Sequence, residues 1–307
     1  MIRSSKCQVA AEIEATEGTA ETLEAADAFL VFNAAFDPDV AMNERKPLKG
    51  RFGASLSVPG KRMAKMTFDV ELVGTSSAGS AVHFADALKA CGVAETLVAS
   101  TSATYKPTSN SVSSVTLAMY VDGKRYMMWG ARGTAKLTLE SGKPGMLHFE
   151  FTGADWSVAD VALLSGVSYN SVIPPVFQDV TFTIDSYAAQ IAKIDIDFGN
   201  TVTLRSDITT PSGYLSAMIT DRKAAMTIDP EEVLSATEDF WANLRSGALM
   251  AMSAAMGSVA GNTITLTAPK VQYQKIGMTQ REGMEVLNIN CLLVENTGDD
   301  EWQIAIT

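Results

Sequence analysis

The side chains that most often perform acid–base or nucleophilic chemistry are sparse in this sequence. Only two of the 307 residues are histidines, His83 and His148, and no local pattern of a serine hydrolase, a zinc protease or a phosphate loop occurs. The nearest approach to a phosphate loop is Gly60-Lys61, which lacks the preceding spacing and the following hydroxyl residue. We therefore interpret Gly60-Lys61 as a turn, and the two histidines as solvated residues on a helix and on a strand face.

Paired carboxylates are the second candidate, because two acids on one strand face are the minimum for a calcium or magnesium site. Asp37 with Asp39, and Asp195 with Asp197, have this spacing, but neither pair is followed by the further oxygen ligands of a recognisable metal loop. We interpret both pairs as solvated acids. The sequence thus predicts no metal site and no cofactor.

The three cysteines, Cys7, Cys91 and Cys291, lie far apart in the sequence and include no C-x-x-C pair. Neither a disulfide framework nor a structural zinc site is indicated by such spacing. We expect the cysteines to pack as small hydrophobic side chains. Because nucleophile, base and metal signatures are all missing, the sequence predicts a protein that is not an enzyme.

The composition predicts folded globular structure, since 47% of the residues are hydrophobic and 19% are charged. The net charge of −11 has the wrong sign for a protein that holds nucleic acid through its phosphates. Residues 1–176 carry a net charge of −2, and residues 177–307 carry −9. Residues 1–30 contain no apolar run suited to a signal peptide or a membrane span, which predicts a cytoplasmic origin and no membrane partner.

One segment departs from this acidic balance. Residues 45–65 contain cations and no carboxylate, in a stretch interrupted by prolines and glycines, which predicts a protruding loop. The cations that we expect to form an oligomer or stacking interface are Arg45, Lys46, Lys49, Arg51 and Lys61.

The sequence also contains an internal repeat, because residues 62–73 align with residues 222–233 at a sequence offset of 160. The identical pairs are Arg62 and Arg222, Ala64 and Ala224, Met66 and Met226, Thr67 and Thr227, Asp69 and Asp229, Glu71 and Glu231, and Val73 and Val233. Without a gap, the same offset pairs Arg45 with Arg205 and Gly53 with Gly213. Residues 145–151 align with the region of residues 283–290 at an offset of 138, so the second copy is expected to lack a loop or hairpin.

A helix is expected in each copy, near residues 80–91 and near residues 236–246. The first has apolar residues at helical spacing and a terminal glycine, namely Phe84, Leu88, Cys91 and Gly92. The second has the matching residues Phe240, Leu244 and Gly247, preceded by Ser235 and Glu238 as a capping box.

Most of the remaining sequence predicts strands. Apolar and polar residues alternate over residues 66–72, and Asp122-Gly123 predicts the turn of a hairpin between residues 115–121 and 124–129. A second hairpin is expected through residues 141–145, and the chain is expected to end on a strand. The predicted fold class is mainly β, with one helix per repeat and two tandem β-sandwich or barrel domains that meet near Pro174-Pro175.

Nine short segments together resemble the major tail tube protein of long non-contractile-tailed bacteriophages. They are residues 15–23 (ATEGTAETL), 26–30 (ADAFL), 43–45 (NER), 59–62 (PGKR) leading into 68–72 (FDVEL), 88–92 (LKACG), 130–134 (GARGT), 149–153 (FEFTG) and 219–223 (ITDRK). Each segment is weak alone, but they occur in order along essentially the whole chain.

The resemblance implies a structural virion protein, built from tail-tube-like domains, that stacks as rings into the hollow tail through which DNA passes. Residues 1–176 would form the first tube-like domain, with an N-terminal arm and the basic loop, and residues 177–307 the second. If the family ring has six tube domains, a duplicated subunit closes as a trimer with pseudo-sixfold symmetry. The implied location is the virion tail, assembled in the cytoplasm of the bacterial host.

The implied partners are other copies of the chain, the tape measure protein and transiting phage DNA in the lumen without specific binding, and the tail terminator and tail tip proteins. An acidic lumen suits passage of DNA because it repels the phosphates, and the acidic second half is expected to supply at least its share. The basic loop is expected to reach along the tube axis and dock on acidic surface of the adjacent ring.

Two other interpretations remain open at the level of sequence. The first is another phage structural protein, such as a tail terminator, a contractile-tail tube protein or a capsid-decorating protein. The second is a β-sandwich hydrolase, which the missing catalytic signatures disfavour.

Overall fold

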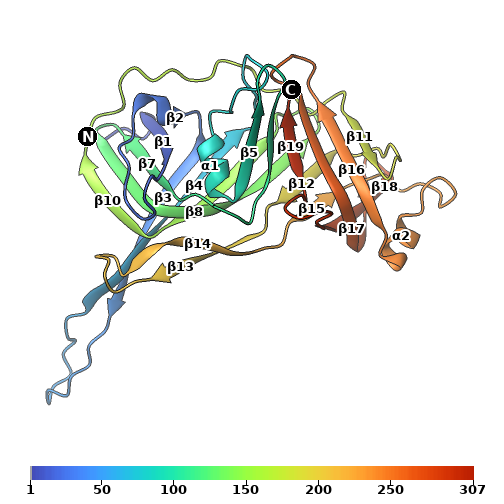
Figure 1. Ribbon diagram of the computed structural model, residues 1–307. Coiled ribbons are helices and arrows are strands. Elements are labelled where there is room, and N and C mark those ends of the chain that lie inside the picture. The colour runs from blue at the N-terminus through green and yellow to red at the C-terminus, as the bar shows by residue number, and fades with distance from the viewer. Residues whose placement is uncertain (1) are drawn as a thin grey trace.

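Antiparallel β-structure dominates the chain, as the sequence predicts. The computed structural model describes residues 2–307, and Figure 1 shows a strand-built body from which one hairpin projects. All strand pairings among these residues are antiparallel. The chain is therefore mainly β, with large antiparallel sheets.

One continuous row of eight strands crosses the whole body. In spatial order these strands are β3 (Phe32–Asn43), β4 (Val58–Glu71), β9 (Met146–Gly153), β8 (Lys124–Glu140), β12 (Lys193–Asp197), β15 (Ala225–Ile228), β18 (Met284–Leu293) and β17 (Ile264–Arg281). The row joins residues from both halves of the sequence, since β8 pairs with β12.

Most of the other strands form two groups, one built outward from the N-terminal part of β8 and the other from the N-terminal part of β17. Around β8 lie β2 (Ala28–Phe29), β1 (Cys7–Ile13), β7 (Val115–Val121) and β10 (Asp155–Asp160). Around β17 lie β11 (Thr181–Ile184), β16 (Leu249–Met256), β19 (Gln303–Ile306), β6 (Ser102–Pro107) and β5 (Val93–Val98). A separate hairpin consists of β13 (Asn200–Ser206) and β14 (Tyr214–Arg222).

Apolar and polar residues alternate strictly along β4, so one face of the strand packs in the core and the other face does not. Met66, Phe68 and Val70 are buried in the core, whereas Thr67 and Asp69 lie on the other face of the strand. The ring of Phe68 lies 5.4 Å from that of Phe149 and 5.7 Å from that of Phe151, both on the neighbouring strand β9. Aromatic packing of this kind fixes the register between β4 and β9.

The helical segments are shorter than the sequence pattern predicts. They are η1 (Ala25–Asp27), α1 (Ala85–Ala90) and α2 (Phe240–Ser246). Gly92 and Gly247 follow α1 and α2 with φ of 71° and 66°, the left-handed conformation that ends a helix and that glycine adopts readily.

Two local expectations about the helices are wrong. Asp239, and not Ser235, caps α2, because its side chain accepts a hydrogen bond from the backbone of Ala242. The Glu238 carboxylate instead accepts from the amide of Asn243. His83 lies in the turn before α1 and not on the helix itself.

The predicted hairpins are confirmed. Asp122 and Gly123, with φ of 40° and 100°, form the turn between β7 and β8, and residues 141–145 connect β8 to β9. The terminal strand is β19. An irregular segment that includes Pro174-Pro175 connects the two halves of the sequence.

The same order of pairings occurs in both halves. Ala35 lies opposite Thr67, and Asp195 lies opposite Thr227, so the sequence shift is 160 on both strands. On the next strand, Phe151 lies opposite Met66 and Cys291 lies opposite Met226, which is a shift of 140. The offset of 138 expected from the sequence is therefore wrong by two residues.

A missing hairpin accounts for the change of offset. In the first half, the β5–β6 hairpin follows α1, whereas in the second half α2 leads directly into β16. The loop or hairpin that was expected to be absent from the second half is therefore β5–β6.

The repeated arginines have the same structural role. Arg62 binds Asp155, at the start of β10, through two hydrogen bonds of 2.5 and 2.9 Å. Arg222 binds Glu301 and Asp299, just before β19, at 2.8 and 2.9 Å. Each arginine thus holds a strand that pairs with the N-terminal part of β8 or of β17.

We expect Arg62→Met to lower the free energy of unfolding by about 2 kcal/mol, because Asp155 is buried and would lose a charged partner. Urea denaturation followed by circular dichroism measures this loss. Lys65→Met is the matched control on the same strand, since Lys65 and Glu150 form an exposed pair worth about 0–1 kcal/mol. Equal losses in the two variants would contradict the assigned role of Arg62.

Candidate functional site

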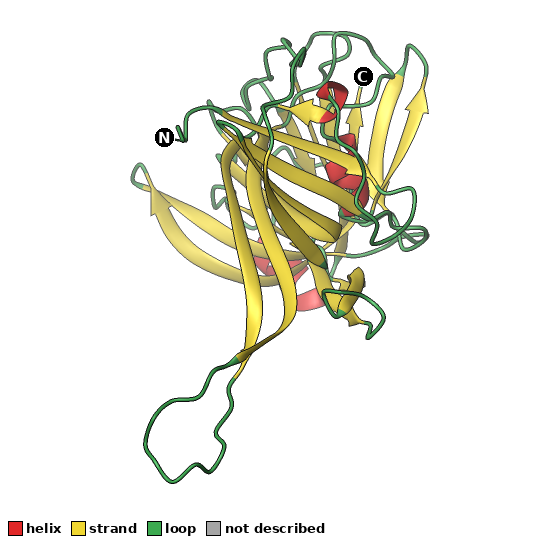
Figure 2. Cartoon of the chain, turned by 90° about the vertical axis from the view of Figure 1, so that its left-hand side faces the viewer, coloured by secondary structure: helices red, strands yellow, loops and turns green. Residues whose placement is uncertain are grey.

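The most distinctive surface feature is the projecting β3–β4 hairpin, which we call the arm and define as residues 40–62. Figure 2 shows the arm leaving the body and ending in an open loop of residues 44–57. Leu48 and Phe52 are fully exposed at this loop, and Leu56 is 86% exposed. Three large exposed apolar side chains on one projecting loop are typical of an interaction surface.

Four of the five cations predicted to form an interface lie together on this loop. Arg45, Lys46, Lys49 and Arg51 are exposed. Lys46 pairs with the neighbouring Glu44 at 3.2 Å, and the Lys49 ammonium donates to the carbonyl of Ala54 at 3.1 Å. These contacts are local to the loop, so they leave the cations at its surface.

Lys61 lies apart from the other four cations, on strand β4 at the base of the arm. Its ammonium lies 2.6 Å from the hydroxyl of Ser206 and 4.7 Å from the centre of the Tyr214 ring. Lys61 therefore attaches the arm to the β13–β14 hairpin.

The β13–β14 hairpin occupies the matching place in the second half, at residues 200–222, but it packs on the body. Ser216 is fully buried, and its hydroxyl donates to Glu17 at 2.6 Å. Arg132 on β8 binds the same carboxylate at 2.7 Å and also donates to the carbonyl of Ala217. Two hairpins of equal length thus differ in that one is docked and the other projects.

The apolar residues of the arm are the part of this surface that sequence reasoning missed. The cations were singled out because a cluster of like charge is conspicuous in an acidic chain. The available signal was Leu48, Phe52 and Leu56 at four-residue spacing, inside a segment whose glycines and prolines exclude a buried element.

The polar face of the eight-strand row is a second extended surface. Its acidic side chains are Asp37, Asp39, Asp69, Glu71, Glu140, Glu150, Asp195, Asp197 and Asp229, and its basic ones are Lys65, Lys136, Lys193, Lys275 and Arg281. Several of the cations are already neutralised, as in the pairs of Lys193 with Asp195 at 2.7 Å and Arg281 with Asp229 at 2.6 Å. The face is therefore acidic, and most of its carboxylates come from the first half of the chain.

The other predicted chemical residues are dispersed. His148 lies on this polar face, 2.5 Å from Asp69, and His83 is exposed near α1. Asp195 is engaged by Thr138 as well as by Lys193, so its oxygens are occupied by protein donors. Among residues 2–307, no group of three or more histidine, cysteine or acidic side chains could hold a metal ion.

The cysteines differ from the expectation in one case. Cys91 and Cys291 are buried, and burial raises the pKa of both thiols. Cys7, expected to pack as a small hydrophobe, is exposed instead, at the beginning of β1. The strand begins at the surface, which explains the difference.

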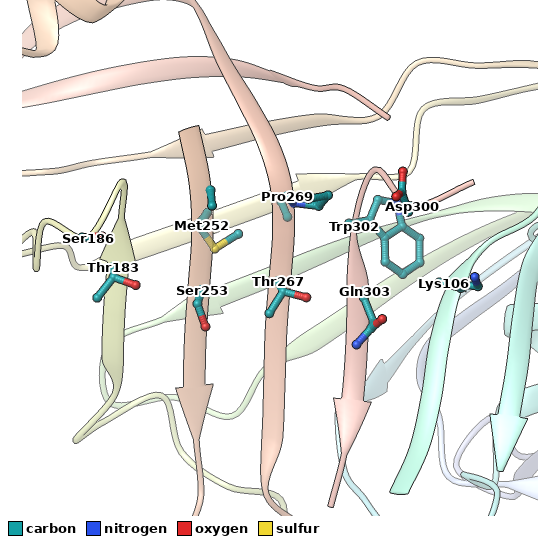
Figure 3. Close-up of a pocket in the computed structure, with 12 residues that line it drawn as sticks. Lys106, Thr183, Ser186, Met252, Ser253, Thr267, Pro269, Asp300, Trp302 and Gln303 are labelled. Atoms are coloured by element: carbon teal, nitrogen blue, oxygen red, sulfur yellow. The ribbon is translucent and has the colours of Figure 1, made fainter. Parts of the chain in front are cut away.

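A hollow of about 490 Å³ lies across strands β11, β16, β17 and β19 (Figure 3). Small hydroxyl and apolar side chains, such as Thr183, Ser253 and Thr267, form most of its lining. Lys106 and Asp300 are its charged residues, near Trp302. These lining residues do not include a nucleophile next to a base, which is the arrangement that covalent catalysis requires.

Four acidic residues lie close together where β1 meets η1 and α1. Burial, followed by the negative charges of Asp27, Asp86 and Glu21, raises the pKa of Glu12 to about 7. Asp86 is itself paired with Lys89 at 3.2 Å. The folded state therefore takes up a proton at Glu12 at a pH where the unfolded chain has already lost it.

Comparison with models of known protein families and with curated proteins gives no match to this chain. Within residues 2–307, none of the helices has the length and apolar character needed to cross a membrane. Inferences about function therefore rest on the surfaces described above.

We expect Glu12→Gln to raise the melting temperature at pH 8 and to change it little at pH 5. The raised pKa means that stability falls as the pH rises from about 4.5 to about 7, and the amide removes this cost. Thermal denaturation at the two pH values measures the effect, with the exposed Glu295→Gln as control. An equal shift at both pH values would contradict the assignment to Glu12.

Proposed function

We propose that this chain is a structural subunit that polymerises as stacked rings into a hollow tube, in the manner of the tail tube proteins that it resembles. The arm is the observation that carries the proposal. A monomer that functioned alone would leave Leu48, Phe52 and Leu56 in water, whereas docking on another copy would bury them. The cations beside them would add electrostatic attraction to an acidic chain.

The two halves of the chain, residues 1–176 and 177–307, are in this proposal two tube-like domains. The support is the repeated order of pairings. The residues of β3 and β4 and those of β12 to β15 are related by a constant sequence shift of 160. Three subunits would then supply six such domains to each ring. The ring would have threefold symmetry and pseudo-sixfold architecture.

The polar face of the eight-strand row suits the lumen of such a tube. Its carboxylates outnumber its cations, and repulsion of phosphates keeps transiting DNA from binding to the wall. The opposite face of the row is committed to the core, so that it could not serve as a lining. In this proposal the protein is part of the virion tail, where the tape measure protein and DNA would occupy the lumen.

Reversing the charge of the loop should block polymerisation and leave the subunit folded. The variant replaces Arg45, Lys46, Lys49 and Arg51 together by glutamate, because single exposed pairs are worth only about 0–1 kcal/mol each. Electron microscopy measures tube formation, and circular dichroism measures folding. Normal tubes from the quadruple variant would show that the loop cations do not contribute to assembly.

The assembled particle should expose more carboxylates than cations to its lumen. A cryo-electron-microscopy reconstruction identifies the lining strands, which we expect to be β4, β9, β8, β12, β15 and β18. A lumen rich in lysine and arginine would contradict this orientation.

A further inference from the structure

We propose that a second copy of this chain pairs its strand β3 with the free edge of β17, and that its arm folds onto the α2 end of the first copy. The interface rests on the proposed self-assembly and specifies which surfaces meet. We infer it from the pairing of β8 with β12, which joins the two halves within one chain.

The two ends of the eight-strand row are unpaired. Among residues 2–307, β3 pairs only with β4, and residues 275–281 of β17 pair only with β18. Both edges therefore present backbone donors and acceptors that a further strand could satisfy. Edges of this kind are sites of strand addition between molecules.

The internal joint between β8 and β12 shows how such edges fit together. Strand β8 is the last of its four-strand set, and β12 is the first of the next. At this joint, Ile196 lies opposite Leu137 and Asp195 lies opposite Thr138. By position in the repeated order, β17 corresponds to β8, and β3 corresponds to β12.

The sequence shifts between the two halves of the chain predict the corresponding register for the joint between two copies. Ile196 corresponds to Phe36, because they face Met226 and Met66 respectively. Leu137 corresponds to Met278, because they face Leu147 and Leu287. Phe36 of one copy therefore lies opposite Met278 of the other.

The same shifts place Ala35 opposite Thr279 and Asp37 opposite Gly277. These pairs correspond to the internal pairs of Asp195 with Thr138 and of Asp197 with Lys136.

The side chains at the two free edges suit this register. Met278 is 64% exposed, and Phe36 is half-buried, although both lie on the core side of the row. Their internal counterparts, Leu137 and Ile196, are each only 1% exposed. Pairing would extend the buried apolar layer across the interface and remove an exposed methionine from water.

The arm supplies an independent second observation. At the sequence shift of 160, Phe52 and Leu56 correspond to Ser212 and Ser216, which are buried where the second hairpin packs on the body. The arm therefore exposes apolar residues at positions whose counterparts are buried in β13–β14, the hairpin that packs on the body. The arm projects because its docking surface belongs to another copy.

The pairings also identify that docking surface. Residues 130–132 of β8, against which β13–β14 packs, correspond to residues 270–272 of β17. There, Gln272 donates to the carbonyl of Gly247 at the end of α2, and Leu249, paired with Gln272, is 51% exposed. We expect Phe52 or Leu56 to cover Leu249.

Cross-linking tests the register directly. In a Cys7→Ser background, Ala35→Cys with Thr279→Cys should give disulfide-linked dimers and larger species on mild oxidation, because paired side chains come within disulfide range. The matched control is Thr138→Cys with Asp195→Cys, which should cross-link within one chain and leave its mass unchanged.

A register control uses Ala35→Cys with Met278→Cys, whose side chains would lie on opposite faces of the sheet. Strong intermolecular cross-linking only in the Thr279→Cys variant supports the joint. Equal cross-linking in both variants, or none while the internal control cross-links, overturns it.

Electron microscopy of the same samples separates this inference from the proposed function. Tubes that form without the cross-link would support the proposed function and refute this interface. Cross-linked species that never form rings would support the interface and refute the proposed function.

The contribution of the arm is tested by Phe52→Ser with Leu56→Ser, which copies the second hairpin. This variant should reduce the Ala35–Thr279 cross-link yield several-fold without loss of folding, since both side chains are exposed in the monomer. Ile208→Ser, at the exposed tip of the docked hairpin, is the control and should have no effect. An unchanged yield in the double variant would show that the arm does not dock at this joint.

Discussion

The pairing of β8 with β12 is the interaction on which the rest of the structure depends. It joins two four-strand sets into one row, and it places Ile194 and Ile196 against Leu139 and Leu137, all of them buried. On the other face, Lys193 lies opposite Glu140 and Asp197 lies opposite Lys136, so the polar surface continues across the joint. A single core therefore extends through both halves of the chain.

The eight-strand row that this pairing creates also explains why two strand edges are unpaired. A row of antiparallel strands that does not close must end in two edges, and each edge exposes backbone groups and the ends of its apolar layer. In this chain the edges are β3 and the C-terminal part of β17, and the arm continues from β3. We propose one explanation for both the unpaired edges and the exposed apolar residues, namely that further copies of the chain complete the folded unit.

Local sequence patterns predicted much of the fold but little of the assembly of the sheets. Alternation in β4, the Asp122-Gly123 turn and the glycines that end the helices act over a few residues, and each was predictable. The cap of α2 was misjudged because Ser235 lies in a separate turn ahead of Asp239. Whether a serine caps a helix depends on where the first helical turn begins, which residue spacing does not determine.

The candidate site was predicted in part for a similar reason. Charge clusters are visible in a sequence, so the loop cations were found, although Lys61 proved to lie at the base of the arm. The exposure of Phe52 and the burial of its counterpart Ser212 depend on long-range packing. The pairing of β8 with β12 likewise joins segments that are far apart in the sequence, and no local pattern encodes it.

The central claim is that this chain completes its sheet by assembling with copies of itself. Negative-stain electron microscopy of the purified protein, over a range of concentrations, tests the claim most directly. We predict hollow tubes of stacked rings, with end views that contain three subunits in a pseudo-sixfold arrangement. A uniform population of monomers at every concentration, with the arm intact, would contradict it.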